Sequence, residues 1–166
     1  MFVLPLPIHL SIHFLLAVLM GYLVGKKFNK ISLGIIAGVS GGFFIDLDHI
    51  LEYFLVYGPH FNLFYFLDGR QFLLSGQIHL WFHAWEYVPI LLLIVWLVRC
   101  KKALSVFLLA LALGAFVHIG SDCVINNYPP RNYSVTYRYS QNFSAKKLLN
   151  APQYQEYLEN RQHLSL

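Results

Sequence analysis

Four long apolar stretches, separated by short polar segments, dominate the chain. They cover residues 7–25, 31 to about 56, 79–98 and 103 to about 125. Each is close to or longer than the roughly 20 residues that an α-helix needs to cross the hydrocarbon core of a bilayer. The pattern therefore predicts about four transmembrane helices.

Two further segments are too polar or too interrupted to span a bilayer. Residues 58–78 combine Gly58, Pro59, Gly69 and Gly76 with several aromatic side chains, which is typical of a loop or interfacial segment at headgroup depth. Residues 126–166 are polar and mixed, and we expect a short surface helix at 151–161. The chain thus divides into a membrane helix bundle at 1–125 and a short polar, extramembrane C-terminal tail at 126–166.

The composition supports this division. Of the residues, 57% are hydrophobic and only 12% are charged, whereas a soluble domain carries about 25% charged residues and needs them to cover its surface. The two cysteines, Cys100 and Cys123, match neither a disulfide framework nor a zinc-ribbon spacing. We predict an all-α fold, a polytopic membrane helix bundle.

The basic residues predict an orientation for this bundle. Six of the twelve Lys and Arg residues lie in two short turns, three at 26–30 and three at 99–102. Short basic turns stay in the cytoplasm, which places the N-terminus, the 58–78 segment and the tail on the other side. We therefore expect a multi-pass membrane protein whose histidine-rich and carboxylate-rich end faces the extracytoplasmic side.

Histidines and carboxylates fall at one end of all four predicted helices, opposite the basic turns. Such residues inside a membrane are costly unless they are paired, bound to a metal or open to water. His/carboxylate pairs spaced i, i+3 or i, i+4 are how a helix bundle presents ligands to an ion. The predicted metal ligands are His13, Asp46, Asp48, His49, His79, His83, His118 and Asp122.

The mixed imidazole and carboxylate donors predict a divalent metal ion in the 1–125 bundle, zinc in the first place and manganese or iron as alternatives. With this many donors, one or two ions are expected. If residues 79–86 are helical, His79, His83 and Glu86 share one face of the third helix, at i, i+4 and i+7.

A metal-lined pocket that faces outward favours hydrolysis by a metal-activated water, with phosphoesters or lipid-linked molecules as substrates and membrane lipids as partners. Glu86 is the predicted catalytic general base, with Glu52 as an alternative. In the tail, Arg131 and Arg138 are predicted to bind a phosphate group, and the alternative is a solvated, slightly basic tail near anionic lipid. The sequence leaves the oligomeric state open.

Two other functions compete with hydrolysis. A metal-ion or proton transporter also carries intramembrane carboxylates and histidines, but it needs polar residues that continue to the cytoplasmic side. A non-enzymatic membrane scaffold would use the metal only to hold its helices together. Nucleic-acid binding is not expected, because the chain has no concentrated basic face.

The pattern of motifs also resembles a known family, the YdjM-like small bacterial inner-membrane proteins, which are assigned as metal-dependent hydrolases. The likeness runs from about residue 9 to 149, and it departs from the family at Ile45, where a proline is usual, and in the His-rich segment at 79–86. It implies an inner-membrane hydrolase with a metal centre. The residues that carry the likeness are His13, the DLDH segment at 46–49, residues 79–86, Gly114, His118, Asp122 and the tail motifs at 127–130, 137–138 and 143.

Overall fold

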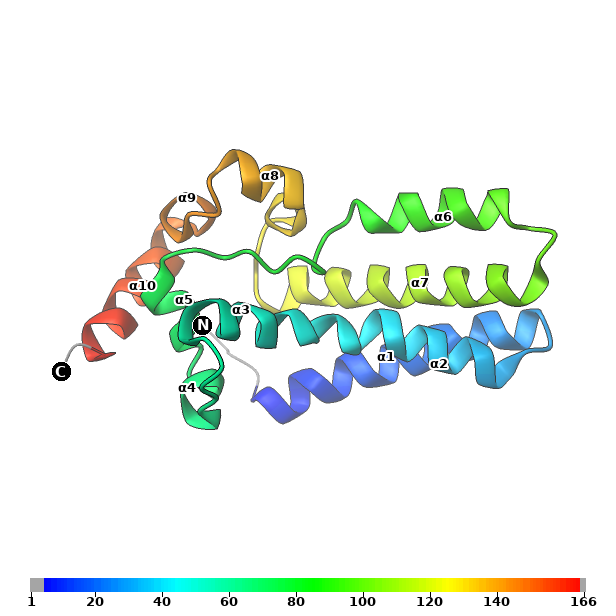
Figure 1. Cartoon of the computed structure of the whole chain (residues 1–166), viewed down its shortest axis with the longest axis horizontal. Coiled ribbons are helices and arrows are strands. Elements are labelled where there is room, and N and C mark those ends of the chain that lie inside the picture. The colour runs from blue at the N-terminus through cyan, green and yellow to red at the C-terminus, as the bar shows by residue number, and fades with distance from the viewer. Residues whose placement is uncertain (1–4, 165–166) are drawn as a thin grey trace.

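The computed structural model describes residues 5–164, and this part of the chain is helical with no strand. One isolated bridge joins Gln77 and Ser144. The helices pack side by side into an elongated bundle, with further short helices gathered at one end (Figure 1). The predicted all-α fold is confirmed.

Within the described residues, three helices are long and apolar enough to cross a membrane. The first is α1 (Leu6–Lys27), and the third is α7 (Lys102–Ile125). The second is a composite over residues 31–57, in which α2 (Ile31–Gly42), the 3₁₀ turn η1 (Phe44–Asp46) and α3 (Leu47–Tyr57) follow one another.

The predicted helix at 79–98 is wrong in its first half. The helix α6 begins only at Tyr87 and ends at Leu97, so it has 11 residues, and residues 79–86 form no helix. Pro89 lies in the first turn of α6, where a missing backbone N–H costs nothing, and therefore does not kink a longer helix. His79, His83 and Glu86 consequently do not share a helical face.

Close contacts between backbones hold α1, α2 and α7 together. A Cβ atom added at Gly34 would collide with the carbonyl of Gly21 on α1. One added at Gly114 on α7 would collide with the carbonyl of Gly38, and one at Gly41 with that of Leu111. Glycine at these crossings lets the helices approach closely enough for side chains from all three to meet.

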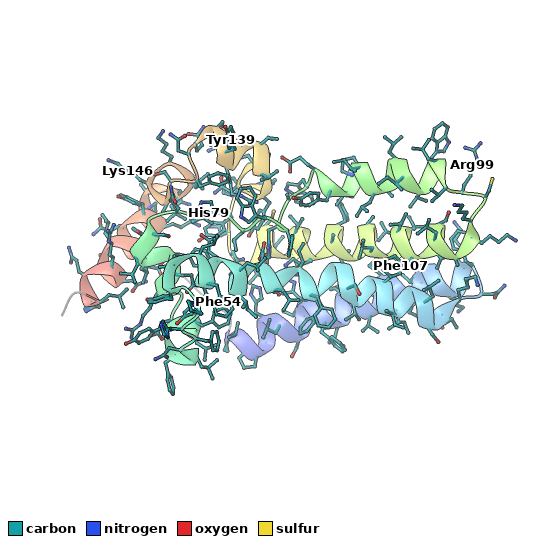
Figure 2. All side chains as sticks on the ribbon, viewed as in Figure 1. Phe54, His79, Arg99, Phe107, Tyr139 and Lys146 are labelled. Atoms are coloured by element: carbon teal, nitrogen blue, oxygen red, sulfur yellow. The ribbon has the colours of Figure 1, made fainter. Side chains whose placement is uncertain are left out.

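The short helices and the tail cover the end of the bundle where α3 ends (Figure 1). The two basic turns lie at the opposite end, and in Figure 2 Arg99 and His79 mark the separation. The expected surface helix of the tail is confirmed as the longer α10 (Ala151–Leu164). The other short helices are α4 (Leu63–Leu67), α5 (Arg70–Ser75), η2 (Pro130–Tyr133), α8 (Val135–Ser140) and α9 (Ala145–Leu148).

Candidate metal centre

Histidine and aspartate side chains from four separate segments meet inside the covered end of the bundle. Among the described residues, they form four overlapping groups of three, and within each group the donor atoms lie within 4.8 Å of one another. The members are His9 and His13 of α1, Asp46 and His49 of the second span, His83 of the 79–86 segment, and His118 and Asp122 of α7.

His83 and His118 face each other at the middle of this cluster. Their Nε2 atoms are 3.0 Å apart. His118 Nδ1 donates to the carbonyl of Gly42 at 2.9 Å, and His83 Nδ1 donates to Asp48 Oδ2 at 3.0 Å. Because these oxygens only accept, each ring donates through Nδ1 and turns its Nε2 toward the other ring. A proton or a metal ion satisfies this pair of nitrogens.

The α1 side of the cluster repeats this arrangement. Ser121 Oγ donates to the carbonyl of His118, and so accepts from His13 Nδ1 at 3.2 Å. His13 Nε2 then lies 2.6 Å from His9 Nε2 and 3.0 Å from Asp122 Oδ1. In His13, His83 and His118, a hydrogen bond at Nδ1 therefore fixes the ring so that Nε2 points into the cluster. Metal-binding histidines are usually oriented in this way.

Two carboxylates complete the cluster. Asp46 Oδ1 lies 3.2 Å from His83 Nε2 and 3.5 Å from His118 Nε2. Asp122 Oδ2 lies 3.5 Å from His118 Nε2. Asp46 Oδ2 is buried and has no hydrogen-bond partner among the described residues. Buried lone pairs and negative charges that converge in this way fit a divalent metal ion, whose preferred donors they are.

His83 reaches the cluster because buried side chains hold the irregular 79–86 segment. Glu52 accepts hydrogen bonds from His79 Nδ1 at 2.7 Å and from the backbone N–H groups of His79 and Leu80. Asp48, one turn earlier on α3, accepts from Phe82 N at 2.9 Å. Non-helical backbone is tolerated at such a depth only when other protein groups satisfy it.

Asp48 and His79, two of the predicted ligands, therefore stand outside the metal groups. The carboxylate of Asp48 orients His83 from behind, and His79 is bound to Glu52. The structure brings together the other six, His13, Asp46, His49, His83, His118 and Asp122.

The predicted base, Glu86, also lies outside the groups. Its Oε1 accepts from Ser134 Oγ at 2.6 Å, from Thr136 Oγ1 at 2.8 Å and from Thr136 N at 3.1 Å. Partial burial by itself raises the pKa of Glu86, but these hydrogen bonds outweigh it and lower the pKa to about 2. The carboxylate of Glu86 therefore ties the start of α8 to the start of α6.

The two arginines of the tail have different surroundings. Arg138 is buried, and its guanidinium donates to the carbonyls of Leu80 at 2.7 Å, His83 at 2.9 Å and Asn132 at 2.8 Å. Arg131 is exposed and lies over the ring of Tyr137. Arg138 thus supports the backbone that presents His83 through carbonyls, whereas Asp48 holds the ring of His83.

A cavity of about 380 Å³ adjoins the cluster, with a volume in the usual range for small-molecule sites. His9 and His49 line it, so donor atoms of two metal groups face open space. Apolar side chains such as Phe72 and Leu80 form its walls, and Tyr157 of α10 lies at its edge. The cavity therefore lies next to the cluster at the covered end of the bundle.

Sequence reasoning left His9 out of the ligand set. The spacing could have indicated His9 as a ligand, because His9 and His13 are at i, i+4 and thus share a face of α1. No sequence pattern indicates the groups that orient the rings of His118 and His13. The Gly42 carbonyl and Ser121 are recognisable as these partners only once α2 and α7 are placed together.

Comparison with known proteins finds no match for this chain among family models, curated proteins or solved structures. The argument for function consequently starts from the geometry of the cluster. The described structure provides imidazole and carboxylate donors, a buried inner set that includes His13, His83 and His118, and an adjoining cavity.

Proposed function

We propose that the protein is a membrane-embedded, metal-dependent hydrolase that acts on a phosphoester or lipid-linked substrate. One observation carries the proposal. His13, His83 and His118 are each hydrogen-bonded through Nδ1 and each turn Nε2 toward buried aspartate oxygens. This is the arrangement of a preorganised metal centre, because the ligands need not reorganise to bind an ion.

The donor set supports zinc first, with manganese and iron as alternatives. It can hold two ions, one between His9, His13 and Asp122, and the other between Asp46, His49 and His83, with His118 between them. Such ions supply a nucleophilic water of lowered pKa and a positive charge for the departing oxygen.

The protein's own residues supply the rest of the mechanism. The apolar walls of the cavity, which include Phe72 and Leu80, hold the apolar part of the substrate beside the cluster. The buried rings of His13 and His118 exclude competing water, which strengthens every electrostatic interaction nearby. The free Asp46 Oδ2 is the best-placed proton acceptor, because the carboxylates of Glu86 and Glu52 are engaged elsewhere.

The proposed location is the inner membrane, with the cluster on the extracytoplasmic side. The basic turns at the other end of the bundle support this orientation. Membership of the YdjM-like family is part of the same proposal and rests on the motifs alone.

A transporter is the less favoured alternative. Between the cluster and the basic turns, α1, α2 and α7 pack through the apolar side chains of Val24, Ala37, Val106 and Ala110. An ion that crosses the membrane would need polar groups there. The buried cluster also suits a structural metal, which predicts binding without turnover.

The test is elemental analysis of the detergent-purified protein, followed by hydrolysis assays on phosphomonoesters and phosphodiesters. We expect about one or two equivalents of zinc, manganese or iron, a loss of metal in His118→Ala, and turnover that chelation removes and metal restores. The matched control is His60→Ala, which changes an exposed loop histidine. Metal-free wild-type protein, purified without chelators and supplied with ions, would reject the hydrolase. Bound metal without turnover on any ester would favour the scaffold.

A further inference from the structure

A second, smaller chamber lies directly beside the candidate metal centre. It has a volume of about 100 Å³, and His83 and Asp122 of the metal groups line it. It shares His49, Leu80 and Leu149 with the large cavity, so the two spaces adjoin. At roughly 30 Å³ per water molecule, the chamber has room for about three waters, which suits a tetrahedral oxyanion and excludes a whole lipid.

The chamber contains a buried cation, Arg138, which the charges of Asp48 and Glu86 stabilise only from beyond ion-pair distance. Arg138 is only 1% exposed, and it forms no ion pair with any carboxylate of residues 5–164. Its terminal nitrogens are bonded to carbonyls, whereas its Nε has no hydrogen-bond partner among the described residues. A buried charge with an unmet donor is costly unless a ligand satisfies it.

Tyr133 provides a second polar group on the chamber wall. Its hydroxyl oxygen accepts from Asn126 Nδ2 at 3.3 Å, and no described residue takes the hydroxyl proton. In contrast, the residues described around the large cavity include neither Lys nor Arg. Positive charge for an anion is therefore available in the small chamber, next to the metal groups, and not in the large cavity.

We propose that the small chamber is an oxyanion subsite that binds the phosphoryl group of the substrate through Arg138 Nε–H and Tyr133 O–H, while the large cavity holds the remainder of the substrate. This inference rests on the proposed function and deepens it. Arginine suits the role, because a fixed guanidinium donates to phosphate oxygens at a defined angle.

The test measures binding of inorganic phosphate to detergent-purified, metal-loaded protein by isothermal titration calorimetry. Loss of a hydrogen bond to a charged ligand weakens binding by about tenfold or more, so we expect this for Tyr133→Phe, which keeps the ring. Leu149→Trp, at the junction of the two spaces, should reduce the access of phosphate. Arg131→Ala is the matched control, since it removes an exposed cation of the same tail, and should bind phosphate as the wild type does.

The outcomes separate this subsite from the proposed hydrolase. Phosphate that fails to bind wild-type protein, or that binds Tyr133→Phe at wild-type strength, overturns the subsite even when metal content and turnover are normal. Phosphate that binds and responds to Tyr133→Phe supports the subsite even when no ester is hydrolysed. Glycerol 3-phosphate and mixed micelles of phosphatidic acid, as competitors of phosphate, distinguish a soluble from a lipid source of the phosphoryl group.

Discussion

The two ends of the bundle solve the problem of burial in different ways. At the end with the basic turns, α1, α2 and α7 pack directly on one another through apolar surfaces and glycine crossings, and α6 packs on α7. At the other end the spans carry His13, Asp46 and Asp122, which cannot pack against apolar surface alone. There the chain adds the irregular 79–86 segment and the tail. Apolar burial is thus achieved by regular helices, whereas polar burial requires irregular backbone held by hydrogen bonds.

The largest expected effect comes from disrupting the close crossing of α2 and α7, because the packing at both ends of the bundle depends on it. Gly114→Val on α7 would drive a Cβ into the carbonyl of Gly38, so we expect loss of the folded protein or destabilisation by about 3 kcal/mol or more. Thermal unfolding in detergent measures it. Gly120→Ala is the control on the same helix, where the added Cβ meets nothing within 4 Å and should not destabilise. Equal losses in both variants would contradict the role of the close crossing.

A smaller effect, on metal affinity, should distinguish two buried carboxylates at the end of the bundle that holds the metal groups. Asp48 and Glu52 lie one turn apart on α3, but only Asp48 orients a histidine of the metal groups. We expect Asp48→Ala to weaken metal binding by about 10–100-fold, as loss of a residue behind a ligand typically does. Glu52→Ala loosens the 79–86 segment but leaves the ring of His83 bonded to Asp48, so it should reduce stability and weaken metal binding less than Asp48→Ala does. Competition with a chromogenic chelator measures both affinities, and a larger loss in Glu52→Ala would contradict the role of Asp48 behind His83.

The smallest expected effect is a pH dependence at the edge of the polar end. The pKa of Glu86 is lowered to about 2 in the folded protein, below its ordinary value of 4.5. The carboxylate of Glu86 therefore stabilises the fold at pH values above 4.5. That contribution should decline as the pH falls from about 4.5 toward 2. Glu86→Gln should therefore unfold at a lower temperature than the wild type at pH 7, with a gap that narrows by pH 3. Glu159→Gln, on the exposed side of α10, should show no such gap.

The sequence predicted those features that depend only on residues close together in the chain. Three of the spans followed from apolar stretches, and His118 and Asp122 followed from a spacing of four residues on one helix. It did not predict the 79–86 segment, because the hydrogen bonds that hold it come from Glu52 and Arg138, which are distant in the sequence. The aromatic residues of this segment resemble those of a span, and the spacing of four residues between His79 and His83 is typical of one helical face.

The sequence named Arg138 as a phosphate-binding residue, but its support of the 79–86 backbone was not predicted, for a related physical reason. A basic residue in a polar tail is usually solvated, and nothing in the tail indicates that its partners are backbone carbonyls of another segment. Its burial depends on how η2 and α8 fold back onto the bundle, which only the tertiary structure determines.

The contact between Arg138 and the 79–86 segment also has a consequence for biosynthesis. A ribosome makes the residues of α1, α2 and α7 before it reaches residue 138, so the spans can insert and pack while the support of His83 is still missing. The three spans are then packed before the cluster of histidines and aspartates is complete. The order of synthesis keeps the nascent chain from holding a fully formed centre until the tail has emerged and docked.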